Sequence, residues 1–378
     1  MCLGNLGNVG SVPGFCGNLN GVRACCVFLW LACLAWPAAQ TPEFAPLEAR
    51  AAAARDSGRL DQAAALYRQA LALRPAWAEG WWYLGTLLYD QNSYGEASKA
   101  LRKAVAINPK AGTALVMLGL CEFELGDDES ALRHIQDGNR IGIAADAHLR
   151  DVILYHEAAL LQRKGQFEAA QERLNSLCLS GQQGAEVTMT LGMVALRMRQ
   201  TAPPSADAIA KVGYAQCLAG QKKFEEARRE FAAAAARYPE YPNIHYAYGR
   251  FLVDSGDTAA GIEELTREIQ RDPKHTAARL RIAAALYKVD SAAGLPYAAL
   301  AVRLDPEAPL GHYLLGLLLL DTDDYLGAIG ELEIARKAFP REGKVLLALA
   351  AAYARAGRLE DAERARKEFQ RIPQPAGR

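Results

Sequence analysis

Apolar and polar residues alternate at helical spacing along most of this chain. The pattern is clearest in residues 81–109, where Trp81, Leu84 and Leu88 lie three and four residues apart, as on one face of an α-helix. A second helical run follows a polar turn and ends at Pro109. Two short amphipathic helices cannot bury their apolar faces alone, so this pattern predicts neighbouring units of the same kind.

The same pattern returns along the chain with a period of about 34 residues. Successive prolines that end the units are 34, 34, 33 and 34 residues apart wherever both are present: Pro75, Pro109, Pro239, Pro273, Pro306 and Pro340. A glycine recurs inside the first helix: Gly85, Gly119, Gly192, Gly249 and Gly316. Glycine inside a helix costs about 1 kcal/mol relative to alanine, so its recurrence predicts a close approach between the two helices of each unit. In the unit that ends at Pro306, we expect the second helix to begin late, with Pro296 in its first turn.

These residues, in this order, resemble a known repeat family. Trp81-x2-Leu84-Gly85-x2-Leu88, followed by Ala97, Leu101, Ala104 and Pro109, is similar to the tetratricopeptide repeat, a 34-residue helix–turn–helix unit. The resemblance covers about residues 44–371. It implies an all-α fold, a right-handed α-solenoid of antiparallel helix pairs (the TPR superhelix). It also implies that the first helices line a concave face, where members of this family usually bind proteins or peptides without catalysis of their own.

The repeat register slips in the middle of the chain. Pro109 and Pro239 are 130 residues apart where four regular repeats would give 136, and Pro203-Pro204 cannot lie inside a helix. Residues 184–199 therefore predict a first helix without a regular partner. A bend or joint and a merely decayed repeat both remain open. The expected organisation is N-terminal repeats over 44–183, an irregular repeat or joint over 184–207, and C-terminal repeats over 208–371.

Residues 1–39 predict a disordered start followed by a signal peptide. Residues 1–22 are rich in glycine and asparagine, and a translation start near Val22 remains open. Arg23 precedes an apolar run that ends in small residues, with cleavage expected near Ala39, so we expect an exported protein, periplasmic or secreted. The run is shorter than the roughly 20 apolar residues of a membrane span, so none is expected in the mature chain. Trp30 stands where a lipoprotein box has an aliphatic residue, so we expect no lipid anchor at Cys33.

The net charge and the positions of the cysteines and histidines argue against several classes of function. The formal net charge is +0, which argues against a nucleic-acid partner because such proteins carry a basic face. Cys121, Cys178 and Cys217 lie far apart in predicted helices, and we interpret them as small core residues rather than a disulfide framework. His245 and His312 occupy equivalent repeat positions, which indicates repeat residues rather than a metal pair. We therefore predict no catalytic residues, no metal site and no cofactor.

The candidate site is the concave face that the resemblance implies. Mapping the groove positions of the family onto the first helices selects nine residues: Trp82, Tyr89, Phe123, Tyr155, Tyr246, Arg250, Tyr287, Lys288 and Tyr313. Aromatic residues and arginine are the usual anchors of protein interfaces, although packing between repeats would explain each aromatic equally well. Acidic and basic residues are mixed on the same face, so it favours neither an acidic nor a basic ligand.

The sequence thus favours a non-catalytic scaffold that binds a protein or peptide partner in a concave groove. The alternative is a docking or assembly subunit of an envelope enzyme complex or a secretion machine. Neither the partner nor the oligomeric state follows from the sequence.

Overall fold

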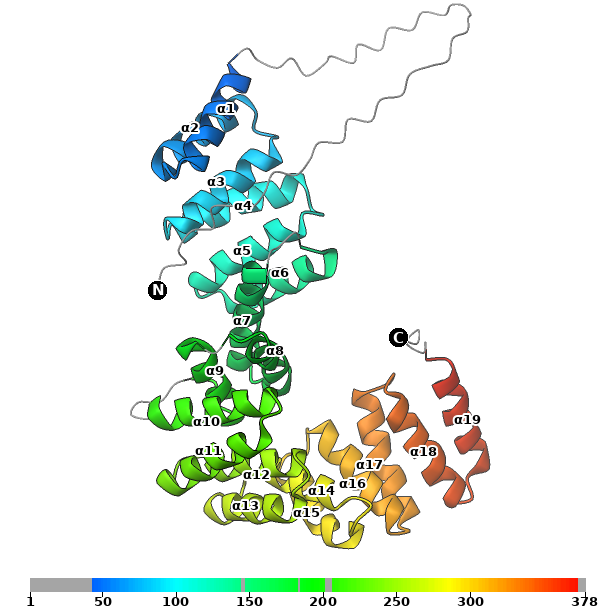
Figure 1. The fold of residues 1–378 in the computed structure, drawn as a ribbon. Coiled ribbons are helices and arrows are strands. Elements are labelled where there is room, and N and C mark those ends of the chain that lie inside the picture. The colour runs from blue at the N-terminus through cyan, green and yellow to red at the C-terminus, as the bar shows by residue number, and fades with distance from the viewer. Residues whose placement is uncertain (1–42, 144–146, 183, 201–205, 373–378) are drawn as a thin grey trace, which may run out of the picture. The chain divides into compact units, whose positions relative to one another are not determined.

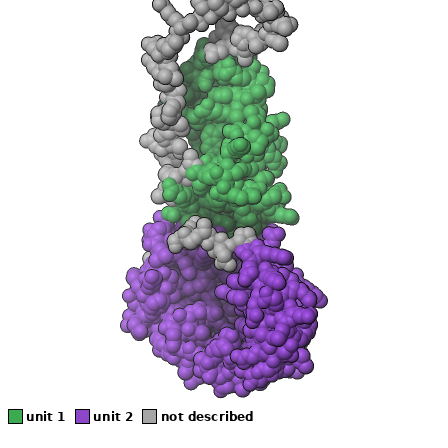
Figure 2. All heavy atoms as spheres, turned by 90° about the vertical axis from the view of Figure 1, so that its right-hand side faces the viewer, with its two compact units in different colours: residues 1–161 green, residues 162–378 purple. Residues whose placement is uncertain are grey.

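The computed structural model describes residues 43–143, 147–182, 184–200 and 206–372 (Figure 1). Every regular element within these ranges is an α-helix, and no strand occurs in them. The chain divides into two compact units, residues 1–161 (unit 1) and 162–378 (unit 2), which are green and purple in Figure 2. The signal peptide predicted in residues 1–39 lies outside the described residues.

Helices follow one another with short connections in both units. Unit 1 contains α1 (Phe44–Asp56), α2 (Leu60–Leu73), α3 (Ala78–Asp90), α4 (Tyr94–Ile107), α5 (Gly112–Glu124), α6 (Asp128–Ile141) and nearly all of α7 (Ala147–Arg163). Unit 2 contains α8 (Phe167–Leu179), α9 (Ala185–Ala195), α10 (Ala206–Gly220), α11 (Phe224–Arg237), α12 (Ile244–Asp254), α13 (Thr258–Arg271), α14 (Thr276–Leu286), α15 (Ser291–Leu304), α16 (Pro309–Asp321), α17 (Tyr325–Ala338), α18 (Gly343–Arg355) and α19 (Leu359–Gln370). No helix in the described part of the chain is long and apolar enough to cross a membrane.

The helices pack in consecutive pairs, as the repeat pattern predicts. In unit 1, α1 packs on α2, α3 on α4 and α5 on α6; in unit 2, the pairs run from α10–α11 to α18–α19. Several second helices begin at an aspartate whose side chain accepts a hydrogen bond from a backbone N–H three residues later: Asp127, Asp257, Asp290 and Asp324. Aspartate is among the best residues at this position because it satisfies a backbone donor that the helix itself leaves unpaired.

The recurring glycines are the points where the helices of a pair approach most closely. A Cβ atom on Gly85 would lie 2.6 Å from Leu101 Cγ, and one on Gly316 would lie 2.6 Å from Leu332 Cγ. At Gly249 a Cβ atom would lie 2.8 Å from the carbonyl oxygen of Gly261. Alanines on the second helices of three such pairs are fully buried: Ala97 on α4, Ala131 on α6 and Ala328 on α17. The predicted close approach is therefore confirmed at these pairs.

Helix α9 pairs with α10 as extensively as the helices of the regular pairs do, and it also packs on α8. A Cβ atom on Gly192 of α9 would lie 1.9 Å from the carbonyl oxygen of Ile209, and one on Gly213 of α10 would lie 1.7 Å from that of Thr188. Helix α10 also packs on α11, so it serves two neighbours. Because α8, α9 and α10 pack together, the irregular segment 184–207 lies inside unit 2, and the boundary between the units falls earlier, at 161/162.

Replacing Gly213 by alanine should separate α9 from α10. The added methyl group meets a backbone carbonyl, which cannot move aside as a flexible side chain can. We expect a loss of about 1–3 kcal/mol in the free energy of unfolding, the usual cost of overpacking, measured by urea denaturation.

The control for this variant is Gly330→Ala, the same substitution inside α17, where a Cβ atom meets nothing within 4 Å. That variant should gain about 0.5–1 kcal/mol, because alanine restricts the unfolded chain more than glycine does. Equal effects of the two substitutions would show that the α9–α10 contact is not as close as the structure has it.

Two expectations from the sequence were wrong. Pro296 does not lie in the first turn of its helix, because α15 begins at Ser291, where the Asp290 side chain accepts a hydrogen bond from Ala293 N–H. The proline is therefore held inside the helix, where it cannot donate a backbone hydrogen bond. The cysteines also differ from the prediction, because Cys178 and Cys217 form a disulfide that joins α8 to α10.

The sequence does not indicate the disulfide, because its two cysteines are 39 residues apart. Only the packing of α8 and α10 beside each other brings their Cα atoms to 5.6 Å. The third cysteine, Cys121, is free and buried, as predicted, and burial raises the pKa of its thiol to about 12.

Candidate interaction surface

In unit 1, the four predicted groove residues differ in their exposure. Trp82 on α3, Phe123 on α5 and Tyr155 on α7 are half-buried, so part of each ring remains accessible. Phe123 and Tyr155 both pack edge-on against His156, at ring-centroid distances of 4.6 and 5.3 Å. Tyr89 is only 5% exposed, and this burial raises the pKa of its hydroxyl. Trp82, Phe123 and Tyr155 can therefore contribute surface, and Tyr89 can only support it.

In unit 2, two of the predicted residues are core residues in this structure. Tyr246 is 4% exposed and Arg250 is 9% exposed. Both lie on α12, and the Arg250 guanidinium donates a hydrogen bond of 3.2 Å to Gln216 Oε1 on α10. Their burial follows from the position of α10, which packs on α12 as well as on α11 and α9. Neither side chain offers much surface to a partner.

The remaining predicted residues of unit 2 are more accessible. Tyr287, which follows α14, and Tyr313 on α16 are half-buried, and burial raises the pKa of the Tyr313 hydroxyl. Lys288 is exposed, lies 5.1 Å from the centroid of the Tyr287 ring and forms an ion pair with Asp321. Tyr287, Lys288 and Tyr313 therefore place two aromatic rings and one paired cation on the surface of α14 and α16.

Several charges on the first helices of unit 2 are neutralised by the neighbouring repeat. Arg281 on α14 pairs with Asp254 on α12, and Lys288 after α14 pairs with Asp321 on α16. Asp321 also accepts a hydrogen bond of 2.6 Å from the Ser291 hydroxyl. Pairing between successive repeats therefore neutralises part of the mixed charge on these helices.

Two leucines on the first helices are exposed, although the sequence did not single them out. Leu310 on α16 is 65% exposed and Leu347 on α18 is 47% exposed. Leu310 lies three residues before Tyr313, so the helical period puts the two on one face of α16. Leucine at helical spacing is the ordinary signal of a core position, so only the exposure in the folded chain distinguishes these two. Figure 2 shows that unit 2 is hollowed on the face turned toward the viewer.

His245 and His312 each contact a carboxylate of their own repeat. His245 lies 2.6 Å from Glu264 and His312 lies 2.6 Å from Glu331, in both cases from Nδ1 to a carboxylate oxygen 19 residues later. Glu331 and the carbonyl of Pro306 raise the pKa of the His312 imidazole despite its burial. Among the residues that the structure describes, no group of three histidine, cysteine or acidic side chains could hold a metal ion.

The fold and this surface define an all-α repeat solenoid of stacked helix pairs. A family model described as tetratricopeptide repeat matches residues 48–111, 84–138, 215–276 and 313–372, which together make up more than half of the chain. The chain belongs to the tetratricopeptide repeat family. The segment between the second and third matches, residues 139–214, contains α7, α8, α9 and the first part of α10.

Several solved structures are similar to this chain. Residues 41 to the end of MamA from Desulfovibrio magneticus RS-1 are 22% identical, with 44% of this chain and 94% of that chain covered and a TM-score of 0.41. A further crystal structure of MamA is 17% identical, with coverage of 45% and 98% and a TM-score of 0.42. The APC/C hetero-tetramer Cut9–Hcn1 is 12% identical, with coverage of 88% and 87% and a TM-score of 0.37. No curated protein sequence matches the chain.

Proposed function

We propose that this protein is a non-catalytic scaffold that binds a protein or peptide partner on its first helices. The observation that carries the proposal is the presence of exposed apolar side chains on two first helices, Leu310 on α16 and Leu347 on α18. A partner can desolvate exposed apolar side chains of this size, and a few such anchors contribute most of the binding energy of an interface. Trp82, Phe123 and Tyr155 provide comparable anchors in unit 1.

We further propose that the protein acts after export from the cytoplasm. The signal peptide predicted in residues 1–39 motivates this, and the Cys178–Cys217 disulfide supports it. Disulfides persist in oxidising compartments and are rare in the cytosol. Mass spectrometry of the N-terminus of the purified mature protein tests the proposal, because an intact residue 1 would rule out cleavage near Ala39.

A photo-crosslinking experiment tests the binding surface. A photoreactive amino acid replaces Leu310 or Leu347 on the first helices, and in the control it replaces Leu326, which is 73% exposed on the second helix α17. We expect the same partner to be crosslinked from positions 310 and 347 and not from 326. Equal labelling from all three positions would show that the first helices are not the binding surface.

Once that partner is purified, Tyr313→Ala should weaken its binding about 30-fold, because a central interface aromatic contributes about 2 kcal/mol. Leu326→Ala is the matched control and should leave the dissociation constant unchanged in the same titration. Unchanged binding by Tyr313→Ala would remove α16 from the site.

A further inference from the structure

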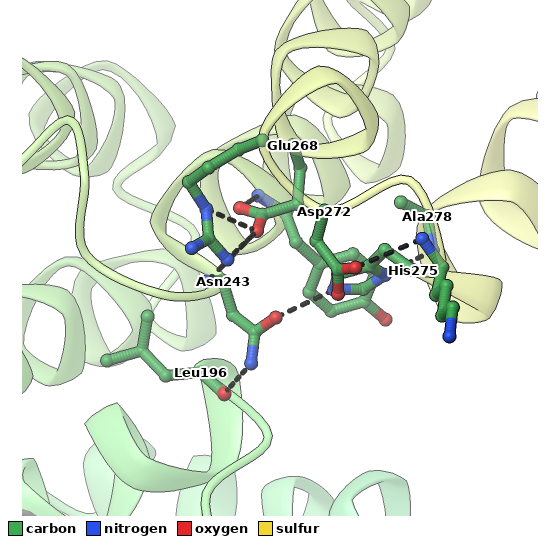
Figure 3. Close-up of polar contacts among 9 residues, drawn as sticks. Leu196, Asn243, Glu268, Asp272, His275 and Ala278 are labelled. Carbon is green, nitrogen blue, oxygen red and sulfur yellow. Dashed lines mark hydrogen bonds and ion pairs between the residues drawn. The ribbon is translucent and has the colours of Figure 1, made fainter.

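A partly buried series of hydrogen bonds connects the end of α9 to the starts of α12 and α14 (Figure 3). The backbone N–H of Ala278 donates to His275 Nδ1 at 3.0 Å. His275 Nε2 lies 2.7 Å from Asn243 Oδ1, and Asn243 Nδ2 donates to the carbonyl oxygen of Leu196 at 2.6 Å. Asn243 thus contacts Leu196, 47 positions before it, and His275, 32 positions after it, at one corner of unit 2.

The two groups at the ends of this series of hydrogen bonds, the Ala278 N–H and the Leu196 carbonyl, determine the protonation state of His275. A carbonyl oxygen can only accept, so the Asn243 nitrogen faces Leu196 and the Asn243 oxygen faces His275. An amide N–H can only donate, so His275 Nδ1 must present its lone pair to Ala278. The imidazole is therefore neutral and carries its one proton on Nε2. A second proton, on Nδ1, would point directly at the N–H of Ala278 and break the cap of α14.

Charged groups of both signs surround this imidazole. From α13, Glu268 and Asp272 favour the protonated imidazole, whereas Arg197, in the turn after α9, disfavours it. The Tyr246 ring of α12 lies 5.1 Å from the imidazole, between ring centroids. Two further cations take part in other hydrogen bonds nearby, Arg271 with Glu268 and Arg279 with the Pro273 carbonyl. Burial outweighs the carboxylates and lowers the pKa of His275 below its ordinary value.

We propose that His275 is a pH-sensitive latch that fastens α9 to the α12–α14 corner when neutral and releases it when protonated. Its protonated form cannot cap α14, and the hydrogen bonds through Asn243 to Leu196 depend on the same ring position. Asn243 has a left-handed backbone conformation, with φ of 66°, which asparagine tolerates better than most residues. The latch joins the region of α9 and α10 to the regular repeats α12–α19. It does not depend on the proposed binding function.

The direction of the pH effect follows from linkage. Because the folded protein holds His275 neutral, this residue binds a proton more readily in the open state than in the closed state. Its contribution to stability is fully present above about pH 6.5 and is lost as the pH falls from there through the lower pKa of the folded state. Each decrease of one pH unit within that window should raise the equilibrium constant for opening of the latch by up to tenfold.

Two measurements on the full chain test the latch. Exchange of the imidazole C2 hydrogen, followed by mass spectrometry, reports the titration of each histidine in the folded protein. We expect His275 to titrate below pH 6.5 and His312, whose pKa is raised, to titrate above it. A His275 midpoint at or above pH 6.5 would overturn the proposal, and this measurement requires no variant.

The second measurement is amide exchange of the peptide covering residues 272–282 between pH 5 and 8, corrected for the intrinsic exchange rate. In the wild-type protein its protection should fall as the pH drops below 6.5. In His275→Asn the dependence should vanish, because asparagine can accept the Ala278 hydrogen bond without titrating. An unchanged pH dependence in that variant would contradict the latch. His312→Asn is the matched control and should retain the wild-type dependence.

Discussion

Replacing Glu268 by alanine should destabilise unit 2 by about 3–5 kcal/mol, the cost of breaking a buried ion pair by removing one partner. Glu268 is fully buried at the end of α13. Its Oε1 accepts a hydrogen bond of 2.6 Å from the Arg271 guanidinium and one of 3.2 Å from the backbone N–H of Asn243. Its Oε2 accepts another of 3.2 Å from the backbone N–H of Tyr246. A carboxylate from α13 thus caps the start of α12, and alanine would leave the backbone N–H groups of Asn243 and Tyr246 without this acceptor.

Urea denaturation followed by circular dichroism measures this loss, and Glu263→Ala is the matched control. Glu263 lies on the same helix and is exposed, so its replacement should change stability by no more than about 0.5 kcal/mol. Glu268→Gln should fall between the two, because the amide oxygen can still accept while the charge opposite Arg271 is lost. A loss below 1 kcal/mol in Glu268→Ala would mean that the α12 cap is not closed as the structure shows.

Removing the Cys178–Cys217 disulfide should cost about 4 kcal/mol. The bond closes a loop between residues 39 positions apart, and a loop of that length restricts the unfolded chain by about this amount. The double variant Cys178→Ala, Cys217→Ala should therefore unfold at lower urea concentration than the oxidised wild-type protein. The loss of stability has a structural as well as an entropic component, because the bond joins α8 to α10 and α9 packs on both of these helices.

Reduction provides the internal control for this prediction. A thiol reductant should lower the stability of the wild-type protein toward that of the double variant and should leave the double variant unchanged. Cys121→Ala, which removes the buried free thiol, should keep the full response to reductant. A wild-type protein that is indifferent to reductant would show that the bond does not form in solution.

Much of the fold followed from local patterns in the sequence. The recurrence of Gly85, Gly249 and Gly316 predicted where paired helices approach, and the structure places a neighbouring atom within 3 Å of a Cβ at each of them. The segment 184–199 was predicted as a single first helix, and α9 occupies residues 185–195. Such features can be predicted from the sequence because helical periodicity and glycine spacing depend on residues a few positions apart.

The candidate surface was recoverable only in part. Trp82, Tyr287 and Tyr313 are half-buried, whereas Tyr89, Tyr246 and Arg250 are buried. The periodic pattern identifies the face of a helix but cannot tell whether a neighbouring repeat covers it. Leu310 and Leu347 were missed for the converse reason, since an apolar residue at helical spacing indicates a core position until the packing shows otherwise.

The sequence by itself determined the repeat, its period and the close helix contacts at its glycines. Only the tertiary structure decided that α10 serves two neighbours, that Cys178 bonds to Cys217, and that His275 and Glu268 close the corner around α12. The physical reason is the range of the interactions. Helix formation and pairing depend on neighbours along the chain, but these contacts join residues 22 to 47 positions apart.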